Sequence, residues 1–156
     1  MSKPDDAPLN VHGTGLLLGQ AGLLLRGPSG AGKSVLALSL LDRWTMLGQP
    51  ACLVSDDRVD LQRSGNRLDM QAPDSLAGLI ELRGRGIVER PHKSPVTLHL
   101  VIDLVPDLVR MLEEEAFTTQ IAGIALPRAP VPAAGVVSLG HQLLLVVEAI
   151  AALDAP

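Results

Sequence analysis

The clearest chemical signal in this chain is a run of eight residues: Gly27, Pro28, Ser29, Gly30, Ala31, Gly32, Lys33 and Ser34. The run matches G-x-x-x-x-G-K-[ST], in which a glycine-rich backbone turns successive N–H groups toward phosphate oxygens. The lysine then neutralises the β- and γ-phosphates, and the serine hydroxyl can bind Mg²⁺. An ordinary glycine-rich turn before a helix is the alternative. Because an apolar run precedes the motif and a helical pattern follows it, we expect a nucleotide-binding P-loop.

A second chemical signal is the acid pair Asp56 and Asp57, which directly follows the apolar stretch 51–55. An acid at the end of a strand beside a P-loop commonly reaches the nucleotide's Mg²⁺. With two adjacent carboxylates, one can contact the metal while the other accepts a proton from a substrate hydroxyl. The residues alone do not decide which acid does which, and a helix cap or loop acid pair is the alternative.

The composition argues against several other partners. The only aromatic residues are Trp44 and Phe117, and the net charge is −4, so neither base stacking nor a basic phosphate-binding face is expected for nucleic acid. No apolar run approaches the ~18 residues of a membrane span, and the first ten residues lack the pattern of an export signal. The four histidines lack zinc-ligand spacing. We therefore expect a cytoplasmic protein with no nucleic-acid or membrane partner.

The length of 156 residues suits one folded unit, and we expect a flexible N-terminal tail at 1–10 followed by a single P-loop domain at 11–156. The hydrophobic pattern predicts an α/β fold: a P-loop-containing core with a twisted mixed sheet, a surface hairpin and a C-terminal helix. Around the phosphate loop it predicts a hairpin of 16–18 with 23–26, a helix over 34–44 and a buried parallel strand at 51–55.

The second half of the chain gives weaker signals. Turn residues predict a surface hairpin of 59–63 with 67–71, and the glycines at 84 and 86 argue against regular structure over 81–86. A single long strand is expected at 96–104, and three prolines predict an irregular, extended connector over 127–132. Further elements are expected as helices at 106–115 and 139–153 and a strand at 118–126.

Four segments together resemble the HPr kinase/phosphorylase family: His12-Gly13, GPSGAGKS at 27–34, LVSDDRVDL at 53–61 and IELRGRGIVE at 80–89. The resemblance covers residues 9–153. Within the family, the chain is similar to the catalytic C-terminal domain alone, as in the short form found in some proteobacteria. It implies an ATP- and Mg²⁺-dependent protein serine kinase acting on the phosphocarrier HPr, with phosphorolysis of phosphoserine-HPr as the reverse reaction. It also implies a homo-oligomer, a hexamer in relatives.

The resemblance also implies roles for single residues. Lys33 would be a catalytic phosphate ligand, and Ser34 and Glu81 would hold Mg²⁺. Asp57 would accept the proton of the HPr serine and return it in the reverse direction, with Asp56 beside it as the reserve candidate.

Two further catalytic residues come from the same resemblance. His12 matches a family histidine near the catalytic acid, and Arg83 belongs to the signature segment used in both directions of transfer. His141 stands where long relatives have an arginine. Because imidazole is mostly neutral near pH 7 and lacks the guanidinium fork, this change favours the kinase direction over phosphorolysis.

Two other function classes stay open from the sequence. One is a non-catalytic, ATP-binding sensor or regulatory protein of the same fold, which the change at His141 favours. The other is a small-metabolite P-loop kinase, which usually carries arginine-rich lid segments that this chain does not show.

Overall fold

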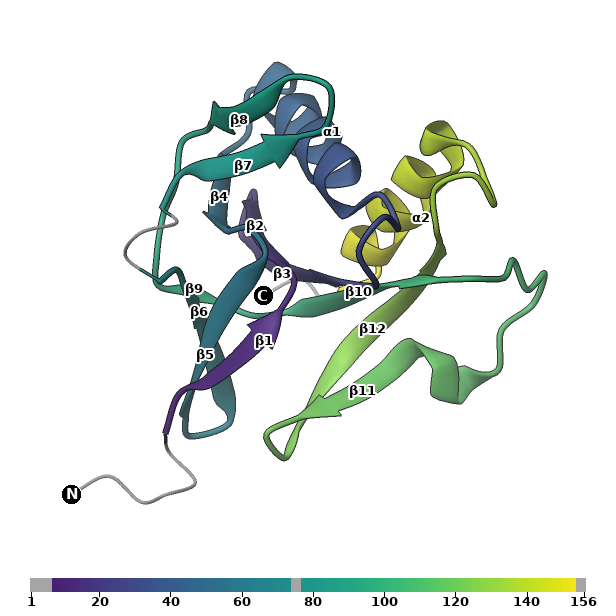
Figure 1. Cartoon of the computed structure of the whole chain (residues 1–156). Coiled ribbons are helices and arrows are strands. Elements are labelled where there is room, and N and C mark those ends of the chain that lie inside the picture. The colour runs from purple at the N-terminus through teal and green to yellow at the C-terminus, as the bar shows by residue number, and fades with distance from the viewer. Residues whose placement is uncertain (1–6, 74–76, 154–156) are drawn as a thin grey trace.

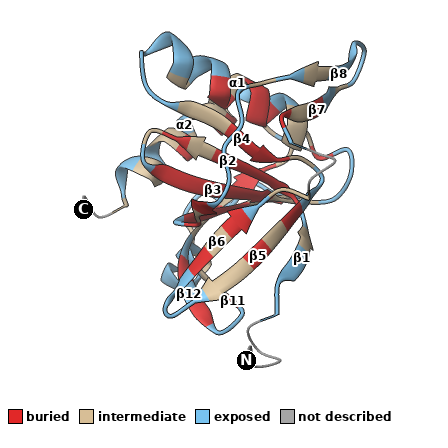
Figure 2. Ribbon diagram, turned by 90° about the vertical axis from the view of Figure 1, so that its left-hand side faces the viewer, coloured by how far each residue is buried: buried red, intermediate tan, exposed pale blue. Residues whose placement is uncertain are grey.

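Strand β3 (Ala21–Arg26) lies at the centre of the protein and is buried on both of its faces. In the computed structural model, which describes residues 7–73 and 77–153, Leu23 and Leu25 pack toward the helices and Leu24 packs toward a second sheet. A run of leucines without polar alternation is what a strand covered on both sides requires. The chain therefore forms three layers: helices, a central sheet and a smaller sheet (Figures 1 and 2).

The central sheet is mixed and has six strands in the order β11-β12-β10-β3-β2-β4. The pairs β3–β10 and β10–β12 are parallel, and the other pairs are antiparallel. The prediction of an α/β fold with a mixed sheet is confirmed. The bounds of the other five strands are β2 Thr14–Leu18, β4 Ala51–Ser55, β10 Leu100–Val105, β11 Thr118–Ile121 and β12 Ile124–Pro132.

The smaller sheet has the order β1-β5-β6-β9, and a separate hairpin is formed by β7 and β8. The predicted hairpin of 59–63 with 67–71 is confirmed as β5–β6, and one of its faces contributes Val59, Leu61 and Met70 to the second core. These strands and one 3₁₀ helix have the bounds β1 Leu9–His12, β5 Arg58–Ser64, β6 Arg67–Gln71, β7 Leu79–Leu82, β8 Gly86–Glu89, β9 Val96–Thr97 and η3 Glu114–Phe117.

Two helices, α1 (Lys33–Met46) and α2 (Leu139–Ala151), cover one face of the central sheet (Figure 1). Helix α1 buries Leu36 and Leu40 completely against that face. The predicted C-terminal helix is confirmed as α2, and the Ser138 side chain caps it by accepting a hydrogen bond from the His141 N–H. Neither helix, nor any other helix in the described residues, is long and apolar enough to cross a membrane.

Several predicted elements have different bounds or partners in the structure. The strand at 51–55 was predicted to pair in parallel, but as β4 it pairs antiparallel with β2. Strand β2 lies between β4 and β3. The stretch 81–86, predicted to be irregular, contains the end of β7 and the turn of the β7–β8 hairpin. At the N-terminus, Leu9 and Asn10 pair with β5, so the predicted flexible tail is too long by at least these two residues, while residues 1–6 lie outside the described residues.

The single strand predicted at 96–104 is two strands in two different sheets. Val96–Thr97 pairs with β6, whereas Leu100–Val105 pairs with β3 and β12. His99 lies between these two strands and is bonded to Gly22 of β3. Its backbone N–H donates to the Gly22 oxygen, and its Nδ1 accepts from the Gly22 N–H. The sequence did not reveal the change of sheet, because strand-forming residues continue through 96–105 without a glycine or a proline.

The helix predicted over 106–115 is wrong. Residues 106–113 are irregular, and only the 3₁₀ helix Glu114–Phe117 follows. Leu108, Val109 and Met111 are exposed, so no apolar surface within residues 7–73 and 77–153 covers the stripe that these three side chains would present on a helix. Helical propensity without such packing rarely stabilises a short helix.

The irregular connector predicted over 127–132 is also wrong, because these residues form the end of β12 and pair in parallel with β10. The Ala133 N–H donates to the Val105 oxygen, so the odd-numbered N–H groups here point toward β10. The backbone nitrogens of Pro130 and Pro132 therefore face the other edge of β12. They need no partner there, because β12 pairs with β11 only as far as Pro127. Proline is tolerated at such an open strand edge.

An ion cluster ties together the three parallel strands. Asp103 on β10 accepts from Arg26 Nε at 2.7 Å and Arg26 Nη2 at 2.9 Å, and it also accepts from Arg128 Nε on β12. Burial raises the pKa of the Asp103 carboxyl, but the hydrogen bonds and charges of the two arginines outweigh burial and leave this pKa below its ordinary value. The cluster should therefore stabilise the ionised carboxylate.

We predict that Asp103→Asn lowers the free energy of unfolding at pH 7 by about 2 kcal/mol, because two arginines lose their shared carboxylate. A carboxyl whose folded pKa is depressed contributes stability above its unfolded pKa, near 3.9, and loses it as the pH falls through the lower folded value. The difference between wild type and variant should therefore shrink below about pH 4. Urea unfolding across pH, with Asp42→Asn as the exposed control, measures this; a pH-independent difference would contradict it.

Candidate active site

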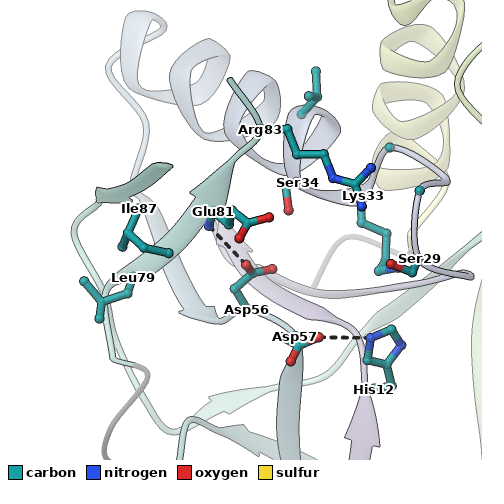
Figure 3. A pocket seen from close by; sticks show the side chains of 13 residues that line it. His12, Ser29, Lys33, Ser34, Asp56, Asp57, Leu79, Glu81, Arg83 and Ile87 are labelled. Atoms are coloured by element: carbon teal, nitrogen blue, oxygen red, sulfur yellow. Dashed lines mark hydrogen bonds and ion pairs between the residues drawn. The ribbon is translucent and has the colours of Figure 1, made fainter. Parts of the chain in front are cut away.

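A hollow lies between the start of α1, the β7–β8 hairpin and the ends of β1 and β4 (Figure 3). It has a volume of about 490 Å³ and brings together segments that are far apart in the sequence. Each of the four segments that carry the family resemblance contributes residues to it. The lining residues are His12, Ser29, Gly30, Gly32, Lys33, Ser34, Val35, Asp56, Asp57, Leu79, Glu81, Arg83 and Ile87.

The glycine-rich loop connects β3 to α1, as the sequence context predicted. Gly30 and Gly32 have φ angles of 85° and 95°, which other residues rarely adopt. Of the eight motif residues, Gly27, Pro28 and Ala31 do not line the pocket. Gly27 lies against Leu104, where an added Cβ would come within 2.9 Å of the Leu104 Cβ, and Ala31 is buried. Gly27 and Ala31 therefore support the loop from beneath, whereas Pro28 is exposed.

Lys33 folds back over the loop that precedes it. Its Nζ donates to the Gly27 oxygen at 2.6 Å and to the Pro28 oxygen at 3.1 Å. Burial lowers the pKa of Lys33, and the nearby carboxylates of Asp56 and Asp57 oppose that effect only in part. The ammonium is thus partly desolvated, and its attraction for an incoming anion is stronger than it would be in water.

Asp56 is held in place by two neighbouring strands. The Thr14 hydroxyl on β2, which is fully buried, donates to Asp56 Oδ1 at 2.9 Å. The Glu81 backbone N–H on β7 approaches Asp56 Oδ2 at 3.4 Å. Both oxygens of this carboxylate are therefore engaged. Sequence reasoning missed Thr14, whose only signal was a hydroxyl at the start of an apolar strand.

Asp57 is held by its backbone and leaves most of its carboxylate open. Its φ angle is 69°, and its backbone oxygen accepts from the Gly13 N–H at 3.0 Å. Oδ1 lies 3.0 Å from His12 Nε2, and because an ionised carboxylate only accepts, the imidazole N–H is the donor. The Asp57 side chain is 67% exposed, so it can still meet a second molecule. The two acids therefore differ in accessibility.

Glu81, Ser34 and Arg83 complete the pocket from its other side (Figure 3). Glu81 belongs to β7, Arg83 to the following turn, and Ser34 to the first turn of α1. The hydroxyl and carboxylates of the pocket are hard oxygen donors of the kind that Mg²⁺ prefers. No group of three or more His, Cys, Asp or Glu within 7–73 and 77–153 could hold a metal alone. An Mg²⁺ ion here would need oxygens from water or a bound phosphate as well.

The family model described as the HPr serine kinase C-terminal domain matches residues 7–154. This chain belongs to the HPr serine kinase family. The resemblance predicted from four short segments is thereby confirmed at the level of the family, and the match covers nearly the whole chain.

Named relatives agree with the family. The chain is 32% identical to "HPr kinase/phosphorylase" of Lactobacillus acidophilus and 30% identical to that of Bordetella avium, in each case over 89% of this chain. It covers 44% and 46% of those two proteins, so it spans about half the length of the curated relatives it matches. A solved structure, "Structure of the Hpr(Ser) kinase/phosphatase from Coxiella burnetii", superposes with a TM-score of 0.72 at 28% identity, over 90% of this chain and 88% of that chain.

We predict that Thr14→Val lowers the free energy of unfolding by about 1 kcal/mol, because the shape of the side chain is kept but Asp56 loses its donor. Thr14→Ser keeps the hydroxyl and serves as the matched control, which should retain the hydrogen bond. Chemical denaturation of the three proteins at neutral pH measures the difference. A valine variant that unfolds at the wild-type midpoint would show that this bond does not hold Asp56.

Proposed function

We propose that this chain is an ATP-dependent protein serine kinase that phosphorylates an HPr-like phosphocarrier, with phosphorolysis of the phosphoserine as the reverse reaction. The observation that carries the proposal is the single pocket in which the Lys33 ammonium and the glycine-rich loop face the acids Asp56 and Asp57. A phosphate-binding loop opposite an accessible carboxylate is the arrangement that transfer to a hydroxyl requires. The names of the relatives, which are longer proteins, support HPr as the partner.

The nucleotide would bind through its phosphates. The backbone of the P-loop, residues 27–34, would direct N–H groups to the phosphate oxygens, and Lys33 would exchange the carbonyls of Gly27 and Pro28 for the β- and γ-phosphates. Ser34 and Glu81, with Asp56 within the same pocket, would hold the Mg²⁺ that neutralises charge on the phosphates. Arg83 at the rim adds a second permanent positive charge.

Asp57 would act as the general base. It would take the proton of the HPr serine hydroxyl while the serine oxygen bonds to the γ-phosphorus and the bond to the β-phosphate oxygen breaks, which releases ADP. His12 would orient the carboxylate through its N–H. In phosphorolysis, inorganic phosphate would attack the phosphorus of the phosphoserine and form pyrophosphate, while the bond to the serine oxygen breaks and Asp57 returns the proton to that oxygen. Asp56 is less suited to the role, because both of its oxygens are already engaged.

Three other expectations stay predictions. A homo-oligomer, hexameric by family resemblance, would place several such pockets in one assembly. A cytoplasmic location fits a kinase of a phosphotransferase system. Residues 11–156 are expected to form one kinase domain.

We predict that the protein with ATP, Mg²⁺ and purified HPr produces phosphoserine on HPr. Asp57→Asn should reduce that rate by about 10²- to 10⁴-fold, the usual contribution of a general base, while ATP affinity changes little. Mass spectrometry of HPr and calorimetric ATP titration measure the two quantities, with Asp42→Asn on the exposed side of α1 as the control. Wild-type turnover by the Asp57 variant would remove this residue as the base. ATP binding without any transfer by the wild type would instead favour the sensor.

Removal of the loop lysine should act on binding itself. We predict that Lys33→Met weakens ATP binding about tenfold or more, because a charge-assisted contact to the phosphates is lost. Lys93→Met removes a positive charge outside the pocket and should leave the affinity near that of the wild type. Equal ATP affinity in all three proteins would mean that phosphates bind elsewhere.

A further inference from the structure

A second pocket of about 470 Å³ continues from the first around the start of α1. The two pockets share Gly32 and Val35. The second pocket extends over the segment 134–139, which connects β12 to α2, and reaches Gln142 on that helix. Its lining includes Val136, Val137 and Leu139 and no charged side chain, so it suits a different part of a ligand from the phosphate pocket.

The segment that forms this pocket is fixed to the glycine-rich loop. The Ala134 N–H donates to the Ala31 oxygen at 3.1 Å. The Ala134 methyl lies so close to Gly32 that an added Cβ there would approach it within 2.8 Å. The preceding residue, Ala133, is tied to the end of β10 through Val105. Whatever lies in the second pocket is therefore held at a set distance from the phosphate loop.

Gln142 presents an unused acceptor to this pocket. The residue is only 2% exposed, and its Nε2 donates to the Pro132 oxygen at 2.9 Å. Because a carbonyl oxygen can only accept, this bond fixes the amide so that Oε1 faces the other way. Within the described part of the chain, no donor reaches Oε1. Every fully buried side-chain oxygen or nitrogen of those residues has a hydrogen-bond partner, so Oε1 is not fully buried. Oε1 is therefore open to the pocket that Gln142 lines.

We propose that the second pocket binds the base of the nucleotide and that Gln142 Oε1 selects adenine by accepting its 6-amino group. This inference rests on the proposed nucleotide binding by the loop. A purine needs apolar contact for its faces and a few fixed polar groups for its edge, which Val136, Val137 and Gln142 provide. A 6-keto base would set one acceptor against another, and the loss of this hydrogen bond weakens binding of that base.

The first test compares ATP, ITP and inorganic tripolyphosphate, since ATP and ITP differ at the 6-position and tripolyphosphate has no base. The wild type should bind ATP about tenfold or more tightly than ITP. Gln142→Met removes the acceptor at similar length and should bring the two within about twofold, with tripolyphosphate affinity unchanged. Leu144→Ala, on the exposed side of the same helix, should keep the wild-type preference.

The second test uses the unaltered protein and does not depend on folding of a variant. Irradiation with 2-azido-ATP should label the tryptic fragment 129–156, which holds the entire segment 134–142 and no lysine or arginine. Excess ATP should prevent the labelling. Label confined to other fragments, or equal wild-type affinity for ATP and ITP, would overturn the base site while leaving the kinase proposal intact. Failure to bind both ATP and tripolyphosphate would overturn nucleotide binding and the base site together.

Discussion

The burial of β3 on both of its faces is the constraint on which the rest of the structure depends. Leu23 and Leu25 meet the helices, Leu24 meets the second sheet, and the strand has neighbours on both edges. A strand enclosed in this way has little freedom to move, because shifting it would disrupt packing in both cores. The glycine-rich loop begins where β3 ends, so its position relative to β2, β4 and β10 is fixed by the core.

The same constraint explains how two adjacent acids acquire different surroundings. Asp56 follows β4 and meets the buried Thr14 hydroxyl of β2, so its carboxylate is engaged on both oxygens. Asp57 takes a left-handed backbone conformation and turns outward to His12 at the end of β1. One carboxylate is thus oriented toward the hairpin side of the pocket, and its neighbour stays open to an approaching hydroxyl. This division supports the proposed roles in a way that the Asp-Asp dipeptide by itself did not.

The glycine-rich loop also lies between two pockets of different chemistry. On one side are the acids, Ser34 and Arg83, and on the other are the segment 134–139 and Gln142. Helix α2 lines the second pocket through Gln142. It also packs against the central sheet, because its Val146 is fully buried in the core between the helices and that sheet. The proposed binding of base and phosphates would thus use one rigid frame, built from the parallel strands β3, β10 and β12.

The sequence by itself determined the local chemistry: the glycine-rich loop between a strand and a helix, the acid pair after a strand, and the turns of the early hairpins. Each of these depends on neighbours in the chain, through glycine conformations, hydrophobic period and motif spacing. What only the tertiary structure decided depends on distant partners. Pro130 and Pro132 are accepted in β12 because β12 pairs with β11 only over residues 124–127. Residues 106–113 stay irregular, with Leu108, Val109 and Met111 exposed, and β9 and β10 lie in different sheets although one strand-like run contains both. The site shows the same division. Asp56 and Asp57 could be singled out as a pair, and the family resemblance placed His12 near the catalytic acid. The contacts of Thr14, His12 and Gly13, more than forty residues away in the chain, decide how each carboxylate is held.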